Sequence, residues 1–375
     1  MRLGLLAGEA SGDILGASVI GAMQQRHGGL EITGIGGPLM TVNGLTSLYP
    51  MDRLSVMGLV EPLKRLPELL SIRSAVFRQQ CQWQPHCFLG IDSPDFNLPL
   101  ERRLRGVGLR TAHLVSPSVW AWRPGRIKSI AESVDLMLCL LPFEVPIYAR
   151  ADIPAVCVGH PLIEELSQLP SKALARQQLG LPANEPVLAV LPGSRSGEVA
   201  NLMPVFLATI RQLQRSHANL TVVIPAASAD RKAQLEGLMG EADGSIVVTD
   251  GGGRLAMQAS DSVLLASGTA SLEAMLLRRP MVIAYRMAWL SWQILSRMAI
   301  TPFAGLPNIL AGREVVPELL QDAVRVEALV SEVEFALERG QETQVVAFEP
   351  LLDAIGGDFA NRCADALEHV MVRRR

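Results

Sequence analysis

The fold of this chain is decided by VLAVLPGSRSGE at residues 187–198, where an aliphatic run ends in a glycine turn that opens a long helix. A short aliphatic run bounded by turn residues is typical of a strand buried on both faces of a parallel sheet. Backbone N–H groups, a hydroxyl and an arginine converge in the turn, which suits an anion such as a diphosphate. The candidate binding residues are Gly193, Ser194 and Arg195. The turn lacks the Lys-Ser/Thr ending of a P-loop, so an ATP-hydrolysing site is not indicated.

The strand–turn–helix pattern recurs along the whole chain in both directions. In the first half the predicted strands are 3–7, 31–35, 87–91, 110–114, 134–140 and 154–158. In the second half they are 187–192, 220–225, 245–249, 261–266 and 281–285. The clearest predicted helices are 197–216, 229–240, 327–338 and 358–372, and the pattern from about residue 317 onward is purely helical. This alternation predicts an α/β fold of parallel sheets covered by helices.

A chain of 375 residues is long enough for two domains. The alternation breaks at residues 159–171, which predicts a hinge, and then starts afresh. We therefore expect two doubly wound, Rossmann-like domains, at residues 1–160 and 161–345, and a helical tail at 346–375 that packs back across the first domain. Ligands of such sheets bind beyond the carboxyl ends of the strands, so a cleft between the domains is the expected active site.

A second glycine turn, ASGTASLE at residues 266–273, follows the next strand but two. Residues Ser267, Gly268, Thr269 and Ala270 can present N–H and hydroxyl donors to a phosphate. Glu273, one turn into the helix, can accept both hydroxyls of a ribose, although a carboxylate there is also favoured by the helix dipole alone.

In the first half, the motif GEASGD at residues 8–13 joins the first strand to the first helix. Gly8, Glu9, Ser11 and Asp13 are candidate binding residues because small side chains let a ligand approach the helix N-terminus. The alternative is a tight turn in which Ser11 or Asp13 caps the helix.

The motif IDSPDFN at residues 91–97 ends another strand. Asp92 lies closest to the strand and is the candidate general base, with a turn-forming role as the equal alternative. Asp95 and Asn97 are predicted to cap the following helix.

Two of the five tryptophans lie one residue apart in SPSVWAWR at residues 116–123. Ser118 and Trp120 are candidate contacts for a sugar or a phosphate. Packing of the rings at the edge of the domain is the alternative.

Composition and charge exclude several classes of protein. A formal charge of -3 does not indicate nucleic-acid binding. The five cysteines form no Cys-x-x-Cys pair and no Asp-x-Asp occurs, so neither a disulfide scaffold nor a metal site is indicated, and no cofactor is expected. The apolar run after Met1-Arg2 is too short for a signal peptide, so we expect a cytoplasmic protein. Apolar segments at 54–80 and 285–298 are candidates for a membrane surface or for helices that cover a sheet.

Taken together, these motifs resemble the lipid-A-disaccharide synthase family, because eight blocks occur in that family's order and spacing. The blocks are Gly8–Asp13 (GEASGD), Ile91–Asn97 (IDSPDFN), Ser116–Trp122 (SPSVWAW), Leu141–Glu144 (LPFE), Pro192–Arg195 (PGSR), Ser267–Glu273 (SGTASLE), Tyr285–Met287 (YRM) and Leu306–Arg313 (LPNILAGR).

The resemblance implies an inverting glycosyltransferase of the B type, with an acceptor-binding first domain and a UDP-sugar-binding second domain. The implied reaction joins UDP-2,3-diacylglucosamine to 2,3-diacylglucosamine 1-phosphate, which gives a β-1,6 disaccharide and UDP. The family's essential aspartate corresponds to Asp92, its arginine to Arg195 and its donor-side asparagine to Asn308, and the matched block adds Tyr285 to the binding residues. The resemblance also implies peripheral association with the cytoplasmic face of the inner membrane, and a homodimer in which C-terminal segments are exchanged.

Three alternatives stay open from sequence. The chain can be another UDP-sugar enzyme of the same fold, such as a peptidoglycan-precursor transferase or a UDP-sugar 2-epimerase. It can also be a two-domain binding protein without chemistry. A nicotinamide dehydrogenase is disfavoured because no Gly-x-Gly-x-x-Gly follows any predicted strand.

Overall fold

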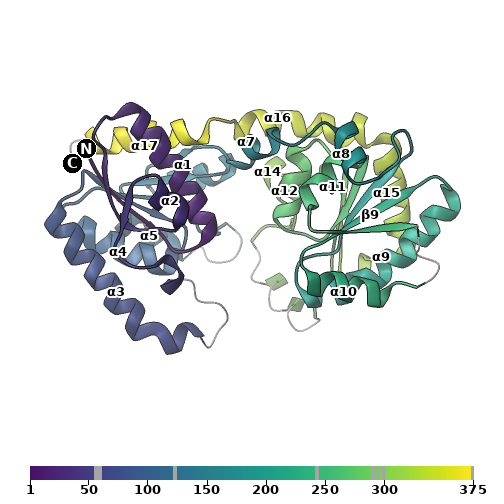
Figure 1. Cartoon of the computed structure of the whole chain (residues 1–375), viewed down its shortest axis with the longest axis horizontal. Coiled ribbons are helices and arrows are strands. Elements are labelled where there is room, and N and C mark those ends of the chain that lie inside the picture. The colour runs from purple at the N-terminus through teal and green to yellow at the C-terminus, as the bar shows by residue number, and fades with distance from the viewer. Residues whose placement is uncertain are drawn as a thin grey trace. The chain divides into compact units, whose positions relative to one another are not determined.

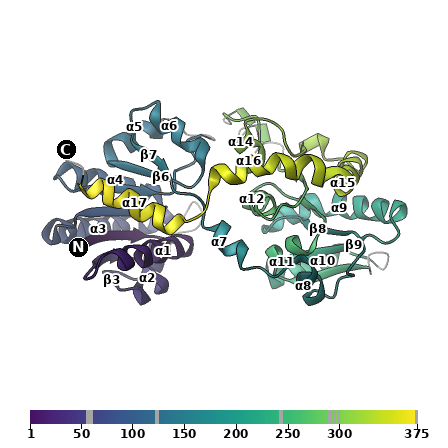
Figure 2. The same ribbon diagram turned by 90° about the horizontal axis from the view of Figure 1, so that it is seen from above.

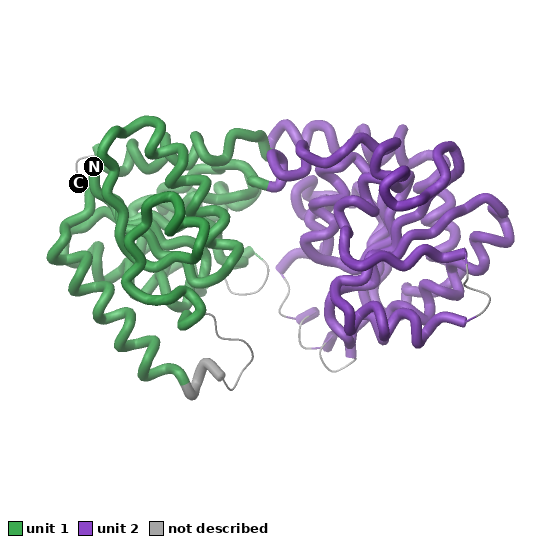
Figure 3. The backbone as a smooth tube through the Cα atoms, in the orientation of Figure 1, with its two compact units in different colours: residues 1–161, 355–375 green, residues 162–354 purple. Residues whose placement is uncertain are grey.

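The computed structural model describes residues 1–54, 61–120, 125–240, 245–288, 292–293, 296–297 and 300–372, with the backbone alone at 61–64. Backbone contacts divide the chain into two compact units (Figure 3). Unit 1 comprises residues 1–161 and 355–375, and unit 2 comprises residues 162–354.

Unit 1 is built on a parallel sheet of seven strands in the order β3-β2-β1-β4-β5-β6-β7. The strands are β1 (Arg2–Ala7), β2 (Glu31–Ile35), β3 (Leu45–Ser47), β4 (Cys87–Ile91), β5 (Thr111–Leu114), β6 (Leu136–Cys139) and β7 (Ala155–Cys157). The chain builds outward from β1 to β3 and then returns to β4 on the other side of β1. The strand order therefore reverses between β1 and β4, and this switch point is where open α/β sheets bind ligands.

Helices cover both faces of this sheet (Figure 1). They are α1 (Ala10–Arg26), α2 (Pro38–Val42), α3 (Glu61–Trp83), α4 (Pro94–Gly106), α5 (Arg126–Ser133), α6 (Val145–Ala149) and α17 (Phe359–Val372). The C-terminal α17 lies beside α1 (Figures 1 and 2), and Phe359 and Leu367 belong to the same apolar core as Leu5 and Val19. Ion pairs of Arg26 with Asp365 and Glu368 fix this packing at the surface. The last helix thus completes the core of the first unit of its own chain.

Unit 2 repeats the design with a parallel sheet of six strands in the order β10-β9-β8-β11-β12-β13. The strands are β8 (Val187–Leu191), β9 (Thr221–Ala226), β10 (Ile246–Asp250), β11 (Ser262–Leu265), β12 (Met281–Tyr285) and β13 (Glu318–Leu320). Its helices are α7 (Leu162–Ser167), α8 (Lys172–Gln178), α9 (Ser196–Ser216), α10 (Ala229–Leu238), α11 (Gly253–Ala259), α12 (Thr269–Leu276), α14 (Leu306–Ala311), α15 (Val326–Gly340) and α16 (Val346–Ile355). Here the strand order reverses between β8 and β11.

The predicted fold class is confirmed: two Rossmann-like α/β units and a helical C-terminal region. All eleven predicted strands are present, but β3 and β13 were missed. Each has only three residues, of which at most two are aliphatic, so neither is long enough to produce the pattern of a buried strand. The prediction of a purely helical pattern after residue 317 was therefore wrong, because β13 adds an edge strand there. Across the described residues, no helix combines the length and apolar character needed to cross a membrane.

Candidate functional site

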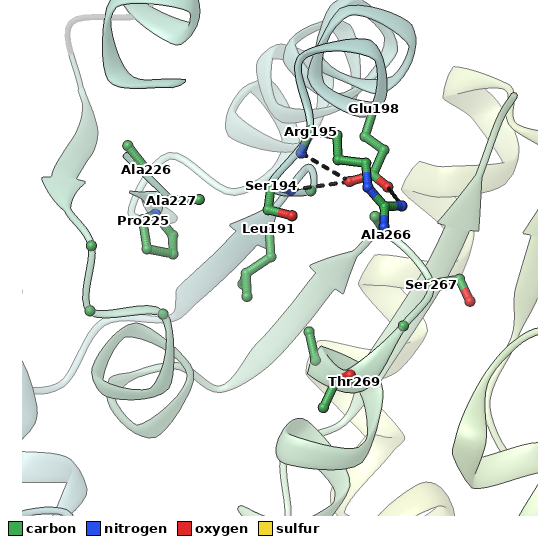
Figure 4. A pocket seen from close by; sticks show the side chains of 16 residues that line it. Leu191, Ser194, Arg195, Glu198, Pro225, Ala226, Ala227, Ala266, Ser267 and Thr269 are labelled. Atoms are coloured by element: carbon green, nitrogen blue, oxygen red, sulfur yellow. Dashed lines mark hydrogen bonds and ion pairs between the residues drawn. The ribbon is translucent and has the colours of Figure 1, made fainter. Parts of the chain in front are cut away.

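Unit 2 has a cavity at its switch point, where a hollow of about 560 Å³ opens at the carboxyl ends of four neighbouring strands (Figure 4). Turns that follow β8, β9, β10 and β11 line it. The lining residues are Leu191, Gly193, Ser194, Arg195, Glu198, Pro225, Ala226, Ala227, Gly251, Gly252, Gly253, Ala266, Ser267, Gly268, Thr269 and Ala270. Both glycine turns predicted from sequence therefore meet at one cavity, together with a third turn, of three glycines, that was not predicted.

In the turn after β8, the carboxylate of Glu198 is the central group. Its Oε2 accepts the backbone N–H groups of Ser194 (3.1 Å) and Arg195 (3.2 Å), and its Oε1 lies 3.1 Å from Arg195 Nη1 (Figure 4). The Arg195 side chain is 83% exposed, so its guanidinium stays accessible to an anion while it pairs with Glu198. Gly193 has φ +113°, and a Cβ there would lie 2.5 Å from Glu198 Oε2. The turn thus requires glycine at this position.

In the turn after β11, Gly268 has φ +138° and Thr269 and Gly268 are exposed. The Ser267 hydroxyl donates to the carbonyl of Ala304 (2.8 Å) and points away from the wall formed by Ala226 (Figure 4). Its observed role is therefore to hold a neighbouring loop, while the backbone of Gly268 to Ala270 supplies the exposed N-terminus of α12.

The loop that contains Ala304 and Gly305 is held by the side chains of Glu318 and Asn308. Glu318 accepts the N–H groups of Ala304 (2.7 Å) and Gly305 (2.9 Å), and also the amide of Asn308 (2.7 Å). The fully buried Asn308 donates further to the Val316 carbonyl and accepts from the N–H groups of residues 315 and 316. All its hydrogen-bonding capacity is used within the chain, so in this structure Asn308 supports the loop. Glu318 was not predicted, because no motif in the sequence marks it.

Glu273, the expected partner of a ribose, lies in α12 with its carboxylate paired to Arg254 (2.8 Å), which also pairs with Glu165 (2.6 Å). Arg254 follows the three-glycine turn. It was not predicted, because an arginine in the first turn of a helix is ordinarily a solvated surface residue. Tyr285 is the half-buried last residue of β12.

At the switch point of unit 1, Gly8 directly follows β1 and Asp92 directly follows β4. A Cβ at Gly8 would lie 2.7 Å from the Ser93 hydroxyl oxygen, so the glycine makes room for the Asp92–Ser93 turn. Asp92 is half-buried, and its N–H donates to the Leu114 carbonyl (2.9 Å). The two first-half motifs therefore lie together at one edge of the sheet.

Two capping predictions near this turn were wrong. No side chain caps α4: Asp95 is exposed and pairs with Arg126, while the Asn97 amide points back to the carbonyls at the end of β4. Neither Ser11 nor Asp13 caps α1. Instead the buried Asp13 carboxylate accepts the N–H groups of Gly37 (2.9 Å), Leu39 (3.0 Å) and Met40 (3.0 Å), so it caps α2. Glu9 and Ser11 are exposed.

The loop after β5 carries Trp120, whose ring packs edge-on against Phe143 with centroids 5.2 Å apart. Beside it Glu144 is buried, and its Oε2 accepts the Leu141 N–H (3.1 Å). Burial raises the pKa of Glu144 to about 7, although hydrogen bonds from Leu141, Ser116 and Trp120 oppose the rise. Packing at the domain edge thus accounts for the observed place of Trp120. Ser118 is exposed, and residues 121–124 lie outside the described part of the chain.

These observations define a class. Two parallel, doubly wound units, with a cavity walled by backbone turns at one switch point, form an α/β architecture that binds its ligands beyond the carboxyl ends of the strands. The UDP-GlcNAc 2-epimerase of Neisseria meningitidis, solved with UDP-GlcNAc, superposes over 100% of both chains with a TM-score of 0.64 at 14% identity. At that identity the likeness concerns the fold.

The sequence comparisons define the family. A family model described as lipid-A-disaccharide synthetase matches residues 3–363. The lipid-A-disaccharide synthase of Pseudomonas aeruginosa (strain LESB58) is 47% identical over 375 residues, covering 100% of this chain and 99% of the relative. That of Chromohalobacter salexigens is 48% identical over 381 residues, covering 100% and 98%. The chain belongs to the lipid-A-disaccharide synthase family, which confirms the resemblance and the assignment as a glycosyltransferase of lipid A biosynthesis.

Proposed function

We propose that this chain transfers the sugar of UDP-2,3-diacylglucosamine to the 6-hydroxyl of 2,3-diacylglucosamine 1-phosphate, which forms a β-1,6 disaccharide and releases UDP with inversion. The substrates follow from the family. The observation that carries the proposal is the cavity of unit 2, because its walls are backbone turns that start α9, α11 and α12. Helix N-termini and glycine turns favour the binding of a diphosphate.

On the donor side, the diphosphate binds the N–H groups of the turn at 268–270 and the exposed Arg195 side chain, which neutralises the charge that develops on UDP. The turn at 193–195 shapes the wall beside it, since Glu198 already accepts the Ser194 and Arg195 N–H groups. Glu273 holds the ribose. Only one of its carboxylate oxygens pairs with Arg254 among the described contacts, which leaves the other to accept a hydroxyl.

On the acceptor side, Asp92 acts as the general base. It removes the proton from the acceptor hydroxyl as that oxygen attacks the anomeric carbon, while the bond to UDP breaks. The transition state carries oxocarbenium character, as in other glycosyl transfers. The support for this role is the position of Asp92 beyond the carboxyl end of β4, at the switch point of unit 1.

The expected membrane contact is α3. Leu66 and Leu70 are each 46% exposed on this helix, with the basic Arg65 and Arg73 close in sequence. Exposed apolar side chains on a helix that also carries basic residues suit an anionic lipid interface at the inner membrane's cytoplasmic face. Leu59 and Leu63 lie outside the described side chains. We expect the protein to be retained on anionic vesicles and the retention to weaken as salt is added. A Leu66→Asp/Leu70→Asp variant should lose this retention.

The reaction is tested by measuring UDP formation from UDP-2,3-diacylglucosamine with and without the acylated sugar phosphate. We expect release of UDP only when the acceptor is present, together with one new disaccharide. Release without acceptor, or conversion of the donor to its 2-epimer, would overturn the proposal. Light scattering of the purified chain tests the expected homodimer.

A further inference from the structure

The turn that carries Asp92 has an unusual backbone. Asp92 and the following Ser93 have φ values of 51° and 43°, so two successive residues with side chains lie in the left-handed region. Such conformations are strained and persist only where the surrounding structure holds them. The Asp92 N–H is held by the Leu114 carbonyl of β5 at 2.9 Å. A second group must hold the other side of the residue.

Asn97 is that group. Its Nδ2 donates to the Asp92 carbonyl at 2.8 Å, and it lies 3.3 Å from the Ile91 carbonyl and 3.4 Å from the Leu6 carbonyl. The opposite orientation of the amide would set its oxygen against three carbonyl oxygens, so the hydrogen bonds fix which atom is the donor. Asn97 is completely buried, and its Oδ1 has no partner among the described residues. A buried oxygen without a hydrogen-bond partner lowers the stability of the fold, so stability alone does not favour an asparagine at this position.

The wall behind Asn97 is rigid and polar. One turn further along α4, Glu101 is also fully buried, and its Oε1 lies 2.8 Å from Nδ1 of the buried His113 in β5. Gly90 in β4 makes this packing possible, because a Cβ there would lie 2.0 Å from Glu101 Oε1 and 3.0 Å from Asn97 Cβ. Asn97 is therefore held from behind by the packing of α4 on β4, and it has little freedom to move away from Asp92.

We propose that Asn97 is a positioning residue that sets the orientation of the Asp92 carboxylate by holding its backbone in the left-handed conformation. Asn97 contacts no substrate in this account and acts only through Asp92. The proposal rests on the proposed function, in which Asp92 is the general base. A misplacement of about 1 Å at a reacting group can lower a rate by about a hundredfold, so the loss of this hydrogen bond has a measurable effect on turnover.

The test is Asn97→Leu in the full-length protein, because leucine has nearly the shape of asparagine but no donor. The matched control is Gln80→Leu. Gln80 is also a fully buried amide of unit 1 with an unpaired oxygen, but it donates to the Thr33 carbonyl, away from Asp92. We expect Asn97→Leu to lower kcat about 10- to 100-fold. The Kd of Asn97→Leu for UDP should stay unchanged, and so should the kcat of the control Gln80→Leu.

The double variant with Asp92→Asn separates positioning from a general loss of structure. If Asn97 acts through Asp92, Asn97→Leu should cause no further loss in that background. Normal kcat in Asn97→Leu, or an equal loss in both backgrounds, would overturn the proposal. If the leucine variant does not fold, Asn97→Ser takes its place, since its hydroxyl is too short to reach the Asp92 carbonyl. Normal turnover of Asp92→Asn alone would refute the general base itself, which is a different outcome.

Discussion

The two switch points of this protein are built in opposite ways on the same kind of sheet. In unit 2 the strands end in glycine turns that leave backbone N–H groups and one exposed arginine around a cavity. In unit 1 the corresponding position holds the carboxylate-bearing turn of Asp92, supported by the buried Asn97 and Glu101. The switch point of unit 2 is therefore suited to binding an anion, and the switch point of unit 1 is suited to presenting a fixed carboxylate.

The difference shows how two copies of one fold can take different parts in a transfer reaction, one binding the donor and the other orienting the base. Backbone donors bind a diphosphate without any particular side chain, so the unit 2 turns tolerate small residues and depend on glycine. A general base must be oriented, so the unit 1 turn depends on a strained backbone and on the groups that hold it. Substitutions in the two units should therefore change different kinetic constants.

The largest expected effect is that of Asp92→Asn in unit 1. General-base assistance is worth about 10²- to 10⁴-fold in rate, so kcat should fall by that factor. The Kd for UDP should be unchanged, because the proposed donor turns lie in unit 2. Steady-state kinetics with a parallel UDP titration checks both values. Near-normal turnover would remove Asp92 from the role of base.

Glu144 should make the stability of the protein depend on pH. Burial raises the pKa of its carboxyl to about 7, above the value in an unfolded chain. The favourable contribution is therefore fully present below about pH 4.5 and is lost as pH rises through about 7, by about 3 kcal/mol at most. Glu144→Gln should remove this loss, so the variant gains stability relative to the parent between about pH 5 and about pH 8.

Denaturant unfolding at both pH values measures that gain. A constant difference between variant and parent would contradict the raised pKa.

In unit 2, Glu318→Gln should loosen the loop beside the second anion turn. The amide cannot accept all three hydrogen bonds that Glu318 accepts from residues 304, 305 and 308. We expect a loss of about 1–3 kcal/mol in the free energy of unfolding and weaker binding of UDP. The exposed Glu314→Gln is the matched control. Equal behaviour of the two variants would refute the supporting role of Glu318.

The smallest effect concerns the first anion turn. Gly193→Ala places a Cβ 2.5 Å from Glu198 Oε2 at φ +113°, so the turn must shift. We expect UDP to bind about tenfold more weakly, which is about 1.4 kcal/mol. Gly197→Ala is the control, because nothing lies within 4 Å of its Cβ position. Isothermal titration of both variants decides whether the shape of the turn matters.

The sequence was sufficient for the architecture because buried parallel strands are short aliphatic runs between turn residues, as in Val187–Leu191 and Cys87–Ile91. It was also sufficient to find the turns at Gly193 and Gly268, because a glycine directly after a predicted strand indicates a tight turn without reference to the rest of the chain. It could not find Glu318, Arg254 or the role of Asn97, because their partners lie elsewhere in the chain or depend on the direction of a side chain. Asp13 was misjudged for the same reason: it caps α2, which begins 25 residues later.

The most direct test of the central claim is a crystal structure of the protein with UDP. We predict that the diphosphate lies in the cavity of unit 2, against the turn at 193–195 and within hydrogen-bonding distance of the backbone N–H groups at 268–270, with the ribose against Glu273. A nucleotide bound in another part of the molecule, with this cavity empty, would contradict the account.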